Sequence, residues 1–388
     1  MSNKSAHEAL PRKTILVLAK GFPPTTGGVE QYSQQVVMAY LRSGYDVVVM
    51  TQTDSSNGWR KVRTDVGDFT LWNCGRGSQP IVFARMIWTA ITARRLRDLT
   101  RVHSTTWRVG IVATLAFRRA SKVITIHGRE VLNVPRLLNQ PMHRAFRNAD
   151  TVISVSHATE LAAKRVIRAC PDRWFVRHNG LSYRDEAIHS QERSPRVGLH
   201  VLSLSRLVPR KNVDITIRAV AAVVAEGFTG LQLWVAGTGP ERERLDDLVT
   251  ELGIQDHVRF LGYVADEDIP GLYRWADVFV HPHTHVGEGN DFEGFGLVIA
   301  DAMSFGCTPI IGDIGGPREL VTDGETGFVV EGSSVGEVSD ALRRLCRDPE
   351  EISRLGRSAQ RHALAAFSWD AHIRPAIHAF GDVAEDRS

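Results

Sequence analysis

Short apolar runs alternate with longer amphipathic segments along the whole chain. The segments between the runs carry helical patterns, and one of these, residues 28–44, ends on Gly44 as a helix C-terminus should. This alternation is typical of parallel sheets covered by helices on both faces, so we predict an α/β fold with two such sheets. The strand-like runs are 13–19, 46–52, 122–128 and 150–156 in the first half, and 199–207, 231–237, 258–264, 277–282 and 308–313 in the second.

The length of the chain also favours two domains. One hydrophobic core rarely serves more than about 250–300 residues, and this chain has 388. Residues 184–198 are polar and strand-free, so we expect them to link the domains. The first domain is then expected at 13–186 and the second at 199–366.

The composition is that of an ordinary globular protein, with 43% hydrophobic and 23% charged residues. No apolar run reaches the ~18 residues that span a bilayer, and residues 1–12 lack the apolar core of a signal peptide. We therefore expect a cytoplasmic protein. The cysteines share no short spacing of the kind found in zinc sites, so they are expected to be structural thiols. They are Cys74, Cys170, Cys307 and Cys346.

Charge is distributed unevenly along the chain. Residues 1–190 hold 28 Lys and Arg against 13 Asp and Glu, a balance of +15, whereas residues 191–388 hold 19 against 31, a balance of −12. The basic excess is dense between Arg85 and Lys122. Two interpretations stay open: a solvated basic face, or attraction of the first half to an anionic acceptor or membrane surface. Nucleic acid is not an expected partner, since no basic motif is interleaved with aromatic residues.

Candidate functional residues follow the predicted strands, where open parallel sheets bind their ligands. After the first strand, Gly27 and Gly28 would let backbone amides approach an anion at a helix start, although a tight turn is the alternative. The spacing is not that of a dinucleotide fingerprint, which argues against a dehydrogenase. His127 ends another apolar strand, beside Gly128, and is expected in the cleft rather than merely packed or at the surface.

The second half offers a pair of cations and a glycine turn. Arg206 and Lys211 leave a buried strand five residues apart and would clamp a diphosphate, unless they are only solvated loop residues. Gly237 opens a Gly-Thr-Gly turn that suits close approach to a ligand, or only a tight turn. Alternate histidines at 281, 283 and 285 could bind a metal, but Pro282 interrupts the strand, and we expect no metal.

Residues 288–303, "EGNDFEGFGLVIADAM", combine acids and glycines with the start of a helix near Leu297. The amides of Gly294–Leu297 would point at a ligand, and phosphate suits a helix N-terminus. Asp301 lies eight residues after Glu293, about 80° beyond two full turns, so the two acids do not share one stripe of the helix. Glu293 precedes the helix and can reach the cleft independently.

In this order and spacing, several segments are specific to one family. Among them are "GFPPTTGGVEQYS", "IHGREV", "SRLVPRKN", "EGFGLVIADAMSFGCTPIIG" and "GGPRELVTDGETGFVV". The chain resembles the retaining glycosyltransferases of family four, which have the GT-B fold of two Rossmann-like domains facing each other across a cleft. "IHGREV", "SRLVPRKN" and "GNDFEGFGLV" are most similar to actinobacterial mannosyltransferases that act on phosphatidylinositol mannosides.

The resemblance implies a role for each candidate residue. Arg206 and Lys211 match the pair that binds the donor diphosphate, and Glu293 matches the acid that contacts the donor sugar. Asp301 falls where the family has a Glu that binds ribose, and it is one methylene shorter. The other matched positions are Gly28 near the phosphate, His127 near the donor sugar, Val264 at the base, and Gly294, Phe295, Gly296 and Leu297, whose backbone holds sugar hydroxyls and phosphate.

The resemblance also implies the reaction. A hexosyl group would pass with retention, and without metal or cofactor, from GDP-mannose or a UDP-hexose to a lipid-linked, polysaccharide or small-molecule acceptor. A cytoplasmic enzyme is expected, with peripheral contact at the inner membrane face as an option, and residues 368–382 would form a tail helix that packs back on the first domain. The alternatives are a nucleotide-sugar epimerase or phosphorylase on the same fold, and a non-catalytic nucleotide-binding partner.

Overall fold

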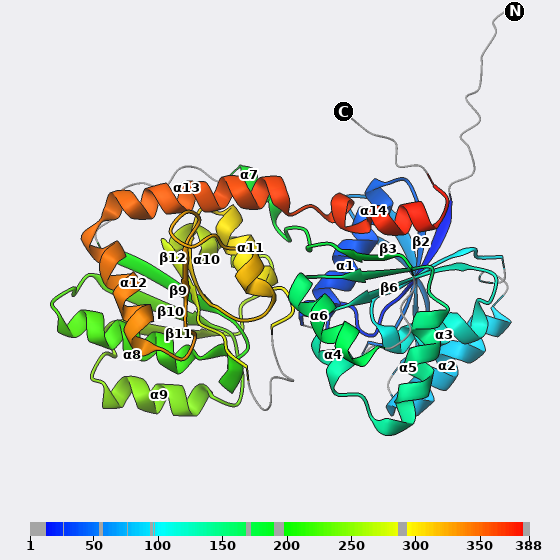
Figure 1. The fold of residues 1–388 in the computed structure, drawn as a ribbon, viewed down its shortest axis with the longest axis horizontal. Coiled ribbons are helices and arrows are strands. Elements are labelled where there is room, and N and C mark those ends of the chain that lie inside the picture. The colour runs from blue at the N-terminus through cyan, green and yellow to red at the C-terminus, as the bar shows by residue number, and fades with distance from the viewer. Residues whose placement is uncertain are drawn as a thin grey trace, which may run out of the picture. The chain divides into compact units, whose positions relative to one another are not determined.

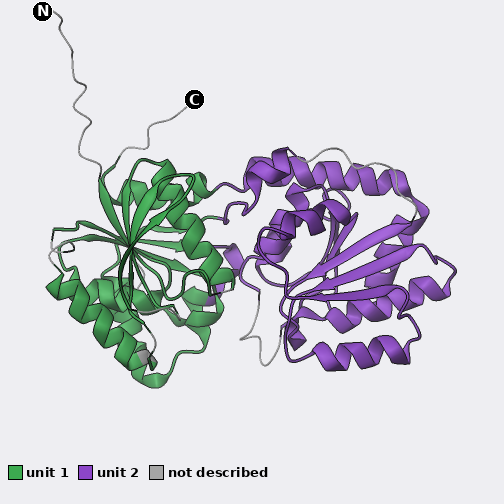
Figure 2. Ribbon diagram, turned by 180° about the vertical axis from the view of Figure 1, so that it is seen from behind, with its two compact units in different colours: residues 1–154, 163–177, 369–388 green, residues 155–162, 178–368 purple. Residues whose placement is uncertain are grey.

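The computed structural model describes residues 13–25, 27–53, 57–75, 77–93, 96, 98–167, 172–189, 198–285 and 293–382. The chain divides into two compact units, coloured separately in Figure 2. Unit 1 comprises residues 1–154, 163–177 and 369–388, and unit 2 comprises residues 155–162 and 178–368. The two units are built from different segments but follow the same α/β plan.

In the described part of unit 1, eight strands form one sheet in the order β3-β4-β2-β1-β5-β6-β7-β8 (Figure 1). Only β3, at the edge, runs antiparallel to its neighbour β4; the other pairs are parallel. The strands are β1 (Thr14–Leu18), β2 (Asp46–Thr51), β3 (Gly58–Arg63), β4 (Asp68–Asn73), β5 (Arg101–Ser104), β6 (Ser121–Ile126), β7 (Thr151–Ser154) and β8 (Trp174–Val176).

Helices cover both faces of this sheet. Alternate strand residues point to opposite faces, so neighbouring residues of one strand contact different helices. On β6, Ile124 belongs to the apolar cluster under α3 and α5, whereas Thr125 hydrogen-bonds Tyr32 of α1. The helices of unit 1 are α1 (Gly28–Arg42), α2 (Gln79–Thr92), α3 (Trp107–Ala116), α4 (Arg129–Leu132), η2 (Arg136–Leu138), α5 (Asn139–Arg147), the last four residues of α6 (His157–Val166) and α14 (Trp369–Ala379).

Among the described residues of unit 2, six parallel strands form a second sheet in the order β11-β10-β9-β12-β13-β14. They are β9 (Leu199–Leu204), β10 (Leu231–Ala236), β11 (Val258–Gly262), β12 (Val278–His281), β13 (Thr308–Gly312) and β14 (Phe328–Val330). The helices are α7 (Arg184–Ile188), η3 (Pro209–Lys211), α8 (Val213–Ala225), α9 (Arg242–Glu251), α10 (Ile269–Trp275), α11 (Leu297–Ser304), η4 (Gly316–Glu319), α12 (Val335–Arg347) and α13 (Pro349–Ala366).

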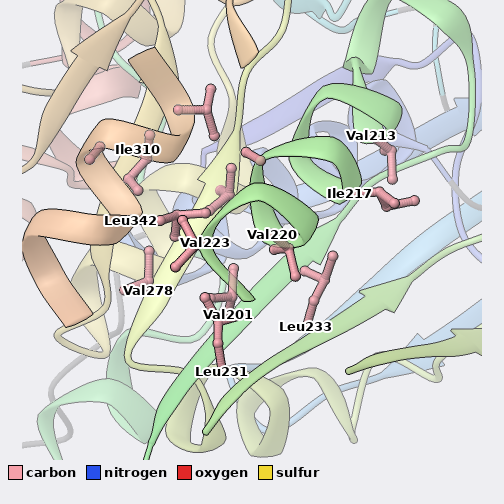
Figure 3. Packing of buried hydrophobic residues seen from close by; sticks show 14 of the residues in the cluster. Val201, Val213, Ile217, Val220, Val223, Leu231, Leu233, Val278, Ile310 and Leu342 are labelled. Carbon is pink, nitrogen blue, oxygen red and sulfur yellow. The ribbon is translucent and has the colours of Figure 1, made fainter. Parts of the chain in front are cut away.

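The core of unit 2 lies between this sheet and helices α8, α9 and α12. Figure 3 shows Val220 and Val223 of α8 beside Leu342 of α12, above Val201 of β9 and Leu233 of β10. Buried aliphatic side chains of this kind contribute about 1.5–3 kcal/mol each relative to exposure. On the opposite face, Tyr273 of α10 packs on Phe279 of β12.

The predicted parallel-sheet architecture is confirmed. Every predicted strand is present, as β1, β2, β6 and β7 in unit 1 and β9 to β13 in unit 2, and the helix predicted to end at Gly44 is α1. The strands β3, β4, β5, β8 and β14 are not in the sequence prediction. Of these, β8 and β14 have three residues each, and β3 is mostly exposed at the sheet edge. None of these three strands therefore carries a long apolar run.

The unit boundary does not lie in the predicted linker. The chain passes from unit 1 to unit 2 between Arg177 and His178, whereas the start of segment 184–198 forms α7, and residues 190–197 lie outside the described part. Among the described residues, Cys74, Cys307 and Cys346 form no disulfide bond, and Cys170 lies outside the described residues.

The C-terminal helix α14 packs on α1, β6 and β7, all within unit 1. Just beyond it, the carboxylate of Asp382 accepts hydrogen bonds from Tyr45 Oη (2.7 Å), Arg101 Nε (2.8 Å) and Lys13 Nζ. Burial acts to raise the pKa of Asp382, but these hydrogen bonds outweigh it and leave the pKa below its usual value. The carboxylate therefore ties the C-terminal segment to the sheet.

Replacing Asp382 with Ala should lower the free energy of unfolding by about 1–3 kcal/mol, because Arg101 loses a largely buried partner. Urea denaturation followed by circular dichroism measures this loss. Asp370→Ala on α14 is the matched control, since Asp370 is 62% exposed and lies 3.7 Å from Arg42; it should cost less than about 1 kcal/mol. Equal losses for both variants would contradict the tie.

Candidate active site

A cluster of buried charges lies where β9 and β12 end in unit 2. The loop after β9 leads into η3, which carries Arg210 and Lys211. Glu293 Oε2 accepts from Arg210 Nη1 at 2.5 Å and from Lys211 Nζ at 2.6 Å. Lys211 Nζ also lies 3.2 Å from Nε2 of His281, the last residue of β12. Lys211 is only 7% exposed, and its buried ammonium group has Glu293 and His281 as partners.

Burial and charge act against each other in this cluster. Burial acts to raise the pKa of Glu293, but the positive charges of Lys211 and Arg210 outweigh it and hold the pKa well below its usual value. Burial lowers the pKa of Lys211, and Glu293 opposes that shift. Burial, with the charge of Lys211, also keeps the pKa of His281 well below its usual value. Glu293 is thus a carboxylate near neutral pH, and His281 is neutral.

The glycines after β10 support the loop that carries Arg206. A Cβ at Gly237 would lie 1.9 Å from the Ser205 carbonyl oxygen, and one at Gly239 would lie 2.2 Å from that of Leu207. Gly237 also has a φ of +124°. At Gly237 the backbone therefore lies close to another part of the chain, the backbone of Ser205. Arg206 itself is exposed in this loop.

The segment before α11 is fixed by its backbone. The carbonyl of Glu293 accepts from the Gly316 N–H at 2.9 Å, and a Cβ at Gly316 would lie 1.9 Å from the Gly294 carbonyl oxygen. Gly296 adopts a φ of +92°, which favours glycine. No N–H of residues 294–297 donates to another described residue, and no side chain caps α11. These amides are placed as an anion would require.

Phe295 and Asp301 are buried. Phe295 packs between His178 and Phe367 at ring distances of 5.7 and 5.9 Å, so only its backbone suits the predicted role. Asp301 is 1% exposed, and its Oδ1 accepts from the Ser182 N–H at 2.7 Å. Burial raises the pKa of Asp301 to about 7. Asp301 therefore holds the segment before α7, and its contact with a ribose stays a prediction.

The unit 1 candidates lie at the ends of β1 and β6. His127 is half-buried, and its Nε2 lies 2.9 Å from the Thr105 carbonyl oxygen, while Tyr32 packs edge-on against the ring at 4.5 Å. Burial lowers the pKa of His127, so the ring is neutral near pH 7. Because a carbonyl oxygen can only accept, Nε2 is the protonated nitrogen and donates a hydrogen bond to the Thr105 carbonyl oxygen. Its Nδ1 is then the acceptor nitrogen.

The glycine loop after β1 already faces a carboxylate. A Cβ at Gly27 would lie 2.3 Å from Oε2 of Glu30, and one at Gly21 would lie 2.4 Å from its Oε1, whereas Gly28 has open space. Glu30 stands in the first turn of α1, where a negative charge is favourable. An anion approaching Gly27 and Gly28 would have to displace this side chain.

Two further expectations concern the base and the histidines. Val264 is half-buried after β11, beside Tyr263, which is 65% exposed. His283 is buried, with its ring nitrogens near the carbonyl oxygens of Ile314 and His281. Within the described ranges, no group of three or more His, Cys, Asp or Glu side chains is arranged to hold a metal ion.

The structure thus joins Lys211 with Glu293 but adds two residues that the sequence prediction gave no role at this point. Arg210 binds Glu293 directly, and His281 contacts Lys211. The Arg-Lys doublet was visible in the sequence, but it did not show that both cations bind Glu293. Arg206 and Asp301 lie outside this ion-pair cluster.

Comparisons with known proteins agree with this architecture. The family model described as Glycosyltransferase Family 4 matches residues 26–183, and the one described as Glycosyl transferases group 1 matches residues 185–362. The chain is 28% identical, over 92% of its length and 95% of the relative, to the GDP-mannose-dependent alpha-(1-6)-phosphatidylinositol monomannoside mannosyltransferase of Mycolicibacterium smegmatis. It is 29% identical, with the same coverage, to the corresponding enzyme for the monoacylated substrate from Corynebacterium glutamicum.

Among solved structures, the Anabaena protein HepE in complex with UDP and glucose matches with a TM-score of 0.73 and 20% identity, over 96% of this chain and 100% of that one. That likeness shows the fold. The chain therefore belongs to the family-four glycosyltransferases with the GT-B fold, and it is an enzyme that uses a nucleotide sugar. This assignment confirms the predicted class over the epimerase, phosphorylase and non-catalytic alternatives.

Replacing Asp301 with Asn should flatten the pH dependence of stability. A carboxyl with a pKa near 7 when folded and about 3.9 when unfolded holds a proton only in the folded state between these values. It therefore stabilises the wild type fully below pH 4 and progressively less up to pH 7, by about 1.4 kcal/mol per unit. Asn cannot titrate but keeps an acceptor for Ser182.

Unfolding free energies of both proteins, measured by urea denaturation from pH 4.5 to about 8, give the difference directly. The wild type should lose up to roughly 3 kcal/mol relative to Asp301→Asn over this range. Asp246→Asn on α9 is the control, since Asp246 is 47% exposed. Parallel curves for the wild type and Asp301→Asn would contradict the assignment.

Proposed function

We propose that this enzyme transfers a mannosyl group from GDP-mannose to a hydroxyl of a lipid-linked acceptor, with retention and without a metal ion. The observation that carries the proposal is that Arg210, Lys211 and the amides at the start of α11 all follow the carboxyl ends of strands in the unit 2 sheet. Arg210 and Lys211 bring two positive charges and Glu293 one negative, which leaves a surplus of one positive charge. Exposed Arg206 adds another. A diphosphate complements this surplus.

The ion pair indicates how the donor would bind. The ammonium of Lys211 has three N–H groups; one faces Glu293 and another faces His281. The third can donate to a phosphate oxygen. As phosphate shares the cations, Glu293 is released from part of its ion pair and can accept hydrogen bonds from the sugar hydroxyls. Donor binding thus exchanges one set of charged partners for another.

The same groups would act during transfer. Negative charge grows on the departing diphosphate as its bond to the anomeric carbon breaks, and preorganised cations and helix amides stabilise that charge. An oxygen of the leaving phosphate can accept the proton of the acceptor hydroxyl, so no separate general base is required. His127, neutral with Nδ1 as its acceptor nitrogen, is proposed to bind a sugar hydroxyl.

The choice of donor and acceptor rests on the relatives. Two relatives that align with nearly the whole chain are GDP-mannose-dependent mannosyltransferases of phosphatidylinositol monomannosides. UDP is the alternative, since HepE binds it. None of the helices in the described part of the chain is long and apolar enough to cross a membrane. We propose that the enzyme reaches its lipid-linked acceptor peripherally, at the cytoplasmic face.

Thermal unfolding with GDP, UDP or ADP tests the donor. A ligand at 100 times its dissociation constant adds about 2.7 kcal/mol to the stability of the unit that binds it, which corresponds to several degrees in Tm. GDP should raise Tm most. A larger shift with UDP would replace GDP-mannose by a UDP-hexose, while leaving the anion site intact.

Replacing Lys211 with Met should lower kcat/KM about 10²–10³-fold, because a preorganised charge on the leaving group is lost. Met keeps the volume of the side-chain stem, and Glu293 retains Arg210, so the loss of fold stability should be small. The assay follows release of GDP from GDP-mannose in the presence of detergent-solubilised phosphatidylinositol monomannoside.

The control for Lys211→Met is Lys61→Met at the edge strand β3, where the side chain is 68% exposed. It should leave kcat/KM unchanged. Activity of Lys211→Met within twofold of wild type would sink the proposed role of the cluster.

A further inference from the structure

Helix α2 in unit 1 is apolar on the face that looks outward. Its inner face, with Val82, Met86 and Ala90, packs into the core against α3. On the outer face, Ile81 is 50% exposed, Trp88, about two turns further on, is 71% exposed, and Ile91, about one turn beyond Trp88, is 56% exposed. A surface helix normally turns polar residues outward, and one that is apolar all round is expected to be covered. Three of the large exposed apolar side chains of the described residues therefore share one helix face.

The sequence that contains this face is basic. From residue 79 to residue 122, the sequence holds nine Arg and Lys and one acid, Asp98. Arg85 lies between Ile81 and Trp88 in the helix and is exposed, and its Nη1 donates to the Cys74 carbonyl oxygen at 3.1 Å. Arg118 and Arg119 are exposed directly after α3, which lies beside α2 (Figure 1). Leu115, in the last turn of α3, adds a further 44% exposed apolar side chain.

We propose that the outer face of α2, with the arginines that follow α3, docks the enzyme on an anionic lipid surface. This inference rests on the proposed function, in which the acceptor is lipid-linked, and it assigns the contact to particular residues. Apolar side chains enter the boundary between headgroups and acyl chains, and an indole is favourable at that depth. Arginines around them attract anionic headgroups. Stable peripheral binding needs both contributions.

The charge pattern favours a membrane over a second copy of this chain. In a symmetric dimer the same patch meets itself, so Arg85, Arg118 and Arg119 would face their own symmetry mates. Like charges brought together at an interface cost free energy. An anionic bilayer instead supplies a negative charge for each of these arginines and an apolar layer for Trp88 and Ile91.

Cosedimentation of the full chain with vesicles tests the proposal. The wild type should bind vesicles of equal parts phosphatidylcholine and phosphatidylglycerol, and bind phosphatidylcholine alone much more weakly. Ile91→Ser and Trp88→Ser should each weaken binding to the mixed vesicles about tenfold, because they remove a side chain that enters the bilayer. The double variant Arg118→Glu, Arg119→Glu should weaken it at least as much, and salt should weaken wild-type binding.

Ile188→Ser on α7 is the matched control, since Ile188 is 52% exposed and belongs to unit 2; it should bind as the wild type does. Equal binding by the wild type, Ile91→Ser and Trp88→Ser would overturn the proposal, as would a wild type that ignores the mixed vesicles. Analytical ultracentrifugation adds a third overturning result. A dimer that Ile91→Ser dissociates would make the face a self-interface.

Failure of this proposal is distinguishable from failure of the proposed function. The α2 variants should keep the wild-type Tm shift with GDP and the wild-type turnover of detergent-solubilised acceptor. If the protein transfers mannose but does not bind vesicles, only the proposed docking surface is contradicted. If the protein binds vesicles through α2 but transfers no sugar, only the proposed function is contradicted.

Discussion

The buried ammonium of Lys211 is the constraint on which the candidate site in unit 2 depends. A charge with so little exposure is costly unless charged and polar partners surround it. Glu293 and His281 supply those partners from segments far apart in the sequence, and Glu293 is itself fixed through its backbone contact with Gly316. Gly237 and Gly316 are needed because the loops approach one another too closely for a Cβ. Charge compensation and backbone packing therefore define the same site.

Much of the fold could be predicted because burial leaves a local trace in the sequence. Strands such as β1 and β9 are buried on both faces, so they appear as continuous apolar runs. The strand β3, with the sequence GWRKVR, leaves no such trace, since it is held at the sheet edge by pairing with β4. Its stability comes from a partner strand rather than from its own composition, and that information is not local.

The site could be predicted in part for a similar reason. Lys211 and Glu293 were both identifiable because each follows a buried strand of a parallel sheet, and parallel strands end at one edge. The short helix η3 carries both Arg210 and Lys211, and it is followed by Asn212, whose φ of +48° turns the chain into α8; the sequence pattern does not indicate this turn. The hydrogen bond between Asp301 and the Ser182 N–H is likewise a contact that no spacing in the sequence indicates.

The uneven charge of the chain is consistent with a local origin of donor binding. Residues 191–388 carry 19 basic and 31 acidic residues, a balance of −12, yet they contain the proposed diphosphate site. At physiological ionic strength, exposed charges more than about 8 Å away are largely screened, whereas buried pairs are not. A few desolvated cations can therefore outweigh a large net charge of the opposite sign. For the same reason, the exposed basic surplus of the first half can attract an anionic acceptor or surface only over about that screening distance.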